Sequence, residues 1–193
     1  MDNYKTIKNP SEGFYAEKRS KFFAFAHHVE SPEDVKELLA GYRKKYYDAR
    51  HVCWAYRLGV DGEQYRINDD GEPSSTAGKP IYGQLLSRVL TDIVVFVVRY
   101  YGGVNLGTSR LIVAYREAAA SALDNAEIEE RHVETIITYS FPYSMMNDVM
   151  KVVKDLQPRV ISKNFDNTCT IKLAIRESRA EELKEKLNKL SFD

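Results

Sequence analysis

Residues 92–123 carry the most regular pattern of apolar positions in the chain. Six consecutive apolar residues at 93–98, five of them β-branched, predict a strand covered on both faces, because no polar residue alternates with them. Apolar positions at helical spacing then predict a helix after Gly107, with Thr108 or Ser109 capping its first turn. The inward face of that helix is predicted to consist of Leu111, Ile112, Tyr115, Ala118, Ala119, Ala122 and Leu123.

Similar patterns predict further strands and helices in the stretch before residue 92. Residues 1–11 predict a loose lead-in, and 22–29 predict a strand. Ser31 followed by proline and two acids predicts the start of a helix. Residues 50–58 predict a strand with His51 and Cys53 on one face, and Asp61-Gly62 predicts a hairpin into a return strand at 64–67. The next helix is expected to start near Pro80, with an inward face of Tyr82, Leu85, Leu86 and Val89.

The last third of the chain predicts a small separate domain. A polar connector at 124–132 precedes a strand at 135–141 and a helix at 142–156. A hairpin of 159–165 with 168–176 follows, and Ser178-x-x-Glu181 forms a capping box for the last helix. The order β-α-β-β-α, with room for a final strand, fits a ferredoxin-like α+β sandwich. We therefore predict domains at 1–132 and 133–193.

Composition narrows the class of protein. Lys plus Arg equals Asp plus Glu, at 28 each, which argues against nucleic-acid binding by bulk charge and leaves a local basic groove open. The longest apolar run has six residues, far short of a membrane span, and residues 1–12 lack the pattern of a signal peptide. With two cysteines far apart in sequence, these features predict a cytoplasmic protein with reduced thiols.

The first candidate site is the glycine turn at 99–107, RYYGGVNLG. A strand, a glycine turn and a helix start leave free backbone N–H groups and a positive helix dipole at one spot, where a phosphate, a carboxylate or an RNA backbone can dock. The candidate binding residues here are Arg99, Tyr100, Tyr101, Gly102, Gly103, Gly107 and Arg110. The alternative is that the glycines only permit a tight turn and the tyrosines belong to the core.

The second candidate site is the loop at 68–80, rich in acids and hydroxyls. Its candidate binding residues are Asp69, Asp70, Gly71, Glu72, Ser74, Thr76, Gly78 and Lys79. The loop lacks phosphate-loop spacing and has Pro80 where that motif has Ser or Thr, and its acids lack calcium-loop spacing. The alternative is an ordered loop that caps the next helix. His51 and Cys53 have no second Cys/His pair nearby, so we predict neither a metal nor a cofactor.

Three stretches together resemble one family. They are residues 49–57, ARHVCWAYR, residues 69–80, DDGEPSSTAGKP, and residues 99–107. They resemble the YigZ/IMPACT family over nearly the whole chain. The resemblance implies a first domain with the two-layer α/β fold of a small-subunit ribosomal protein and of domain IV of elongation factor G. It also implies a ferredoxin-like second domain, and it links eukaryotic members to translational control.

The sequence departs from the usual bacterial pattern of that family after the glycine turn. Asn105 replaces a usual lysine, Ser109-Arg110 replace a glycine pair, and Val113 replaces an arginine. If those basic side chains touch phosphates, this chain has lost two of them and gained Arg110.

The resemblance and the two stretches lead to three hypotheses. The first is a non-catalytic, translation-linked regulatory protein that binds RNA, the ribosome or a protein of the translation machinery; nothing points to DNA or to a membrane. The second is a hydrolase or other enzyme acting on a small anionic substrate, with the acids of 69–72 as base or metal ligands. The third is a protein–protein interaction module without a ligand pocket.

Overall fold

A computed structural model describes residues 2–192. The chain divides into two compact units of mixed α+β architecture. One unit comprises Tyr4–Arg131, and the other comprises the residues from His132 onward together with Asp2 and Asn3. No helix among residues 2–192 is long and apolar enough to cross a lipid bilayer.

A five-stranded antiparallel sheet forms the centre of the first unit. Its strand order is β2-β3-β6-β4-β5. The strands are β2 (Ser11–Glu17), β3 (Ser20–His28), β4 (His51–Leu58), β5 (Gln64–Asn68) and β6 (Ile93–Tyr100). The uninterrupted apolar run lies in β6, the middle strand, with both faces buried as its composition predicts.

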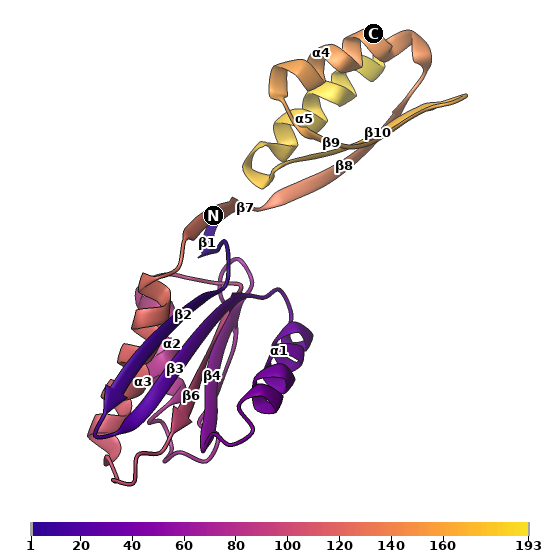
Figure 1. Cartoon of the computed structure of the whole chain (residues 1–193). Coiled ribbons are helices and arrows are strands. Elements are labelled where there is room, and N and C mark those ends of the chain that lie inside the picture. Colours follow the sequence, from indigo (N-terminus) through magenta and orange to yellow (C-terminus); the bar gives the residue numbers. More distant parts are fainter. Residues whose placement is uncertain (1, 193) are drawn as a thin grey trace. The chain divides into compact units, whose positions relative to one another are not determined.

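Helices cover both faces of this sheet (Figure 1). The helices α2 (Gly78–Ser87) and α3 (Thr108–Asp124) pack on one face, and α1 (Pro32–Lys45) packs on the other. Helix α1 adds a third layer to the expected two-layer arrangement. Its cap is the predicted one, because Ser31 Oγ accepts a hydrogen bond from the Asp34 N–H at 3.2 Å.

Several local predictions for the first unit were wrong. The expected loose lead-in contains β1 (Asn3–Ile7), and the polar connector contains β7 (Ile128–His132), with which β1 pairs in a two-stranded sheet. Side chains in β7 are largely exposed, so backbone pairing leaves no apolar pattern in its sequence. Leu86 and Ile112 are exposed, because the buried stripe of each helix is narrower than its apolar content. Val89 is exposed because α2 ends before it.

The second unit is a three-stranded antiparallel sheet with two helices on one face. The strand order is β8 (Glu134–Phe141), β10 (Cys169–Arg176), β9 (Arg159–Phe165). Between β8 and β9 lie η1 (Tyr143–Met145) and α4 (Met146–Leu156), and α5 (Glu177–Lys189) and η2 (Leu190–Phe192) follow β10. Placing β10 between β8 and β9 gives the split β-α-β core of the expected sandwich; no final strand occurs up to residue 192.

The predicted capping box of the last helix was also wrong. Helix α5 starts at Glu177, before Ser178, and no side chain caps it. The Ser178 hydroxyl donates instead to the Asp2 carboxylate, which removes it from the capping role.

Candidate functional site

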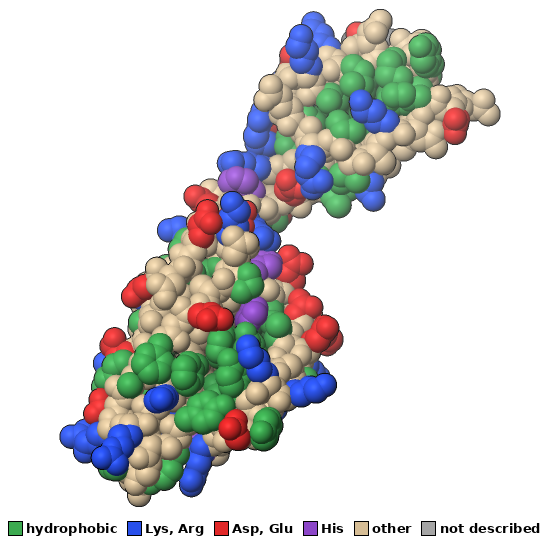
Figure 2. Space-filling view, viewed as in Figure 1, with side chains coloured by type: hydrophobic (Ala, Val, Ile, Leu, Met, Phe, Trp, Pro, Cys, Tyr) green, Lys and Arg blue, Asp and Glu red, His purple; other side chains and the backbone are tan. Residues whose placement is uncertain are grey.

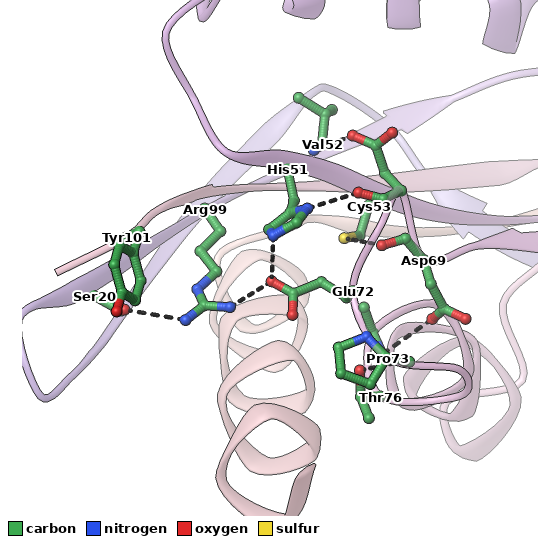
Figure 3. A network of polar contacts seen from close by, with 12 residues as sticks. Ser20, His51, Val52, Cys53, Asp69, Glu72, Pro73, Thr76, Arg99 and Tyr101 are labelled. Atoms are coloured by element: carbon green, nitrogen blue, oxygen red, sulfur yellow. Dashed lines mark hydrogen bonds and ion pairs between the residues drawn. The ribbon is translucent and has the colours of Figure 1, made fainter. Parts of the chain in front are cut away.

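Both stretches singled out by the sequence lie at one end of the five-stranded sheet. Antiparallel pairing puts the start of β3 and the start of β4 beside the end of β6, as the pairs Lys21–Tyr100 and His51–Arg99 show. Strand β5 ends at the same place and leads into the loop 69–77. This loop, the glycine turn 101–107 and the β2–β3 turn therefore meet there, and Figure 3 shows their polar contacts.

Glu72 is the hub of these contacts. Its Oε1 accepts a hydrogen bond from Arg99 Nη1 at 2.5 Å, in an ion pair whose side chains are only 2% and 6% exposed. The same oxygen accepts from the Tyr115 hydroxyl at 3.0 Å and lies 3.2 Å from His51 Nε2. Arg99 Nη2 also donates to Ser20 Oγ at 3.4 Å. Loop 69–77 is thus joined to β3, β4, β6 and α3 through one carboxylate.

His51 joins this network through both nitrogens of its ring. Its Nδ1 lies 2.6 Å from the Asp70 carbonyl oxygen, which can only accept, so Nδ1 carries a proton. Its Nε2 faces the Glu72 carboxylate, which also only accepts when ionised. His51 thereby links Asp70 and Glu72 of the loop to the start of β4.

The other acids of the loop bond to the backbone. Asp69 Oδ1 accepts from the N–H groups of Ala77 and Gly78, and its Oδ2 accepts from Ser75. These bonds hold the start of α2. Asp70 accepts from the Val52 N–H at 2.7 Å. Among residues 2–192, no group of three or more His, Cys, Asp or Glu side chains is placed to hold a metal ion.

Cys53 and Tyr115 lie beneath the network. The Cys53 thiol donates to the Asp69 carbonyl at 3.1 Å and approaches the Tyr115 hydroxyl at 3.4 Å. Burial raises the pKa of both groups well above their ordinary values. A thiol that stays protonated and buried is a poor nucleophile, so Cys53 serves packing.

Two glycines shape the turn that closes the site. A Cβ on Gly102 would lie 2.2 Å from the backbone carbonyl carbon of Arg19, so only glycine lets the two segments approach this closely. Gly107 has φ of 77° and is the N-cap of α3. No side chain caps that helix, which corrects the predicted role of Thr108 or Ser109.

The predicted site residues separate into buried and exposed groups. Glu72, Thr76, Gly78 and Arg99 are buried, and Asp69, Asp70, Tyr100 and Gly102 are half-buried. Tyr100 does not join the network: its hydroxyl donates to Asp48, and its ring packs on the α1 side of the sheet. The exposed group contains Gly71, Ser74, Lys79, Tyr101, Gly103, Gly107 and Arg110. Arg99 therefore does not offer a free charge at the surface, contrary to the sequence-based expectation, because Glu72 pairs with it inside the protein.

The exposed surface over the network is basic and aromatic. The Tyr101 ring is 39% exposed, and the Arg50 guanidinium lies over it at 5.0 Å. A cavity of about 270 Å³ adjoins the start of α3; its lining includes Glu72, Arg99, Asn105, Gly107 and Thr108. Exposed cations at this end of the sheet include Lys18, Arg19, Lys21, Arg50, Lys79 and Arg110. Figure 2 shows Lys and Arg side chains gathered at the lower end of the first unit, where Figure 1 places the β2–β3 turn.

Sequence reasoning did not assign Arg50, His51, Ser20 or Tyr115 to this site. Arg50 and His51 stand in the family-like stretch 49–57, which is the one signal that points to them. On sequence alone, the short basic patch Lys18-Arg19-Ser20-Lys21 is typical of a solvated strand end, and only the strand register brings it beside the glycine turn.

Comparisons with known proteins cover most of the chain. The Impact N-terminal domain matches residues 18–123. An IMPACT family member of Haemophilus influenzae is 34% identical over 176 residues, which cover 90% of this chain and 85% of that protein. The IMPACT family member YigZ of Escherichia coli is 30% identical over 172 residues, covering 88% and 84%.

A solved structure gives a matching fold. The crystal structure of a hypothetical protein superposes with a TM-score of 0.74 at 28% identity, over 99% of this chain and 94% of that one. The structure of the two-domain translational regulator Yih1 is a more distant match, with a TM-score of 0.38 at 25% identity, over 63% and 47%. The match over residues 18–123 and the near-complete overlap with bacterial relatives establish that the chain belongs to the IMPACT family.

Proposed function

We propose that this protein is a non-catalytic regulator linked to translation, and that it binds RNA through the basic surface around Tyr101. The observation that carries the proposal is that exposed cations of the β2–β3 turn, β3, the start of β4 and α3 lie at the same end of the sheet as the exposed Tyr101, with the Arg50 guanidinium over its ring. Such a surface combines attraction to phosphates with a ring on which a base can stack.

The arrangement of acids supports binding over catalysis. Glu72 is enclosed by Arg99, His51 and Tyr115, and Asp69 is occupied by backbone N–H groups. A general base must reach its proton on a substrate, and these carboxylates face into the fold.

Family membership supports the link to translation. The chain belongs to the IMPACT family. The resemblance of its sequence motifs to that family links it to eukaryotic members that take part in translational control. In the proposed role, the Glu72 network fixes the conformation of loop 69–77 and of the glycine turn. The basic surface lies over these two segments and is therefore held in a fixed arrangement.

Titration of labelled single-stranded RNA at several salt concentrations tests the proposal. Each phosphate contact contributes about −0.7 to the slope of log affinity against log salt, so Arg50→Gln and Arg110→Gln should each make the slope shallower by about that amount. Lys151→Gln, an exposed change in the second unit, is the matched control and should leave the slope unaltered.

Three results contradict the RNA version of the proposal. They are negligible RNA binding at low salt, a slope near zero, and equal slopes for wild type and both arginine variants. In that case the surface would be assigned to a protein partner of the translation machinery. Co-purification of such a partner with the wild type and with Lys151→Gln, but not with Arg50→Gln, would support that assignment.

A further inference from the structure

A narrow groove lies on the face of the first sheet that α1 covers. Its cavity volume is about 190 Å³. Three elements line it: α1 with Pro32, Val35, Lys36 and Leu39, β4 with Trp54 and Tyr56, and β5 with Arg66. The groove shares no residue with the Glu72 network, and the proposed function does not use it.

The indole N–H of Trp54 in this lining has no hydrogen-bond partner among the described residues. Its side chain belongs to the buried core and is 6% exposed, stacked on Tyr56 with the rings 5° from parallel. The indole Nε1 itself is buried. Buried polar groups are almost always paired, and an unpaired one costs free energy that an acceptor brought by a ligand recovers.

The charged residues of the lining have one sign. Lys36 and Arg66 are both exposed cations, and neither forms an ion pair among residues 2–192. The Arg66 guanidinium lies 5.9 Å from the Trp54 ring. A ligand that fits this groove therefore carries an apolar group, an acceptor for the indole N–H, and negative charge beside the apolar group.

The edge of the sheet adds a backbone surface next to the groove. Strand β5 is the last strand of the five, so its outer edge pairs with no strand of residues 2–192, and Gln64, Tyr65 and Arg66 are exposed. An extended peptide can add to such an edge through main-chain hydrogen bonds while one side chain enters an adjoining pocket.

We propose that this groove binds an acidic, extended peptide segment of a partner protein. One apolar side chain of phenylalanine or leucine size fills the cavity, a carbonyl oxygen of the segment accepts from Trp54 Nε1, and flanking carboxylates face Lys36 and Arg66. An apolar cavity of about 150 Å³ holds benzene, so this volume suits one such side chain. A nucleobase fits poorly, because its edges need several partners and the mostly apolar lining offers only two neutral polar groups, the indole N–H of Trp54 and the hydroxyl of Tyr56.

Nuclear magnetic resonance of the full chain tests the proposal directly. Trp54 is the single tryptophan of the sequence, so its indole N–H gives one unambiguous signal. The probe is a capped pentapeptide with a central phenylalanine between aspartates. Its addition should shift the indole proton downfield, in the direction of hydrogen bonding. The same peptide with alanine at the centre should leave that signal in place.

Variants and a second ligand complete the test. The double variant Lys36→Glu with Arg66→Glu alters exposed side chains and should weaken peptide binding about tenfold or more. Trp54→Phe keeps an aromatic ring without the donor, and backbone signals around the groove should then report weaker binding. An indole signal that never moves, equal shifts with the alanine peptide, or tighter binding of a short RNA at this groove would each overturn the proposal.

Discussion

At the scale of single residues, the pair formed by Glu72 and Arg99 determines how the site end of the sheet is held. Both side chains are almost fully enclosed, so removing the carboxylate leaves a buried guanidinium charge uncompensated. Glu72→Ala should lower the free energy of unfolding by about 3–5 kcal/mol, because breaking a buried pair costs more than losing a contact. Urea denaturation measures this effect.

Two controls distinguish the effect of an unpaired buried charge on stability from the effect of losing any side chain. Glu127, whose carboxylate is 64% exposed in an ion pair with Lys8, should tolerate alanine with a change below about 1 kcal/mol. Combining Glu72→Gln with Arg99→Met should recover part of the loss, since an uncharged pair needs no compensation. Equal effects of the Glu72 and Glu127 substitutions would contradict the importance of the buried pair.

His27 gives the first unit a pH-dependent stability. Its Nε2 lies 2.5 Å from the Tyr42 hydroxyl, and burial lowers its pKa from the ordinary value of 6.5. The unfolded chain therefore binds the proton more readily than the folded one. Stability from neutral His27 is present above about pH 6.5 and falls as the pH drops through that value toward the lower folded pKa.

Urea unfolding between neutral and mildly acidic pH measures that dependence. Wild type should lose stability on acidification more steeply than His27→Gln, which cannot take up the proton. The size of the pH dependence, rather than the absolute stability, is the diagnostic quantity. Parallel pH profiles for the two proteins would show that His27 does not contribute.

Contacts between side chains that are far apart in the sequence are also the features hardest to predict from the sequence. The loop 69–80 and the turn 99–107 could be singled out from their composition, but Glu72 and Arg99 are 27 positions apart and no local pattern links them. An arginine that follows an apolar run is typical of an exposed strand end. Here β6 continues through Arg99 to Tyr100, and pairing with His51 carries the arginine under the loop.

At the scale of elements, the glycine turn is held by contact rather than by capping. Gly102 packs against the backbone of Arg19, whereas a Cβ added to Gly41, inside α1, would have no neighbouring atom within 4 Å. Gly102→Ala should destabilise the protein by about 1–3 kcal/mol, because a methyl group forces the two segments apart. Gly41→Ala should stabilise it by about 0.5–1 kcal/mol through helix propensity.

Thermal unfolding of the two alanine variants compares them directly. The same chemical change is expected to move the melting temperature in opposite directions, which excludes any general effect of alanine. If Gly102→Ala melts at or above the wild-type temperature, the close approach of the turn to the β2–β3 segment is not required for the fold.

Element prediction succeeded where a local sequence signal is present and failed where pairing with a distant segment decides. The apolar run of β6 and the Ser31 cap of α1 were confirmed because each has a local physical cause. Strands β1 and β7 were missed because each pairs with a partner more than a hundred residues away, and the side chains of β7 are largely exposed. The start of α5 was misplaced because Ser178 bonds to Asp2 instead of to its own helix.

At the scale of the whole molecule, the two units have separate hydrophobic cores. One unit contains two clusters, one on each face of the five-stranded sheet, and the other contains a single cluster built around β10, α4 and α5. The predicted order of strands and helices indicated the α+β class of both units, because the apolar positions showed both strand and helix periodicity. The third layer of the first unit was not predicted, since the face on which α1 packs depends on pairings between distant strands.

Separate cores predict separate unfolding, and the single tryptophan lets the two transitions be distinguished. Leu173 and Leu85 are both fully buried, one in each unit, and leucine-to-alanine changes in such positions cost about 2–5 kcal/mol. Trp54 belongs to the first unit, so Leu173→Ala should leave the fluorescence transition in place while circular dichroism detects earlier unfolding of the other unit. Leu85→Ala should shift the fluorescence transition to lower denaturant. If Leu173→Ala moved both signals together, the units would unfold as one cooperative body, because a cavity confined to one core would then have destabilised the other.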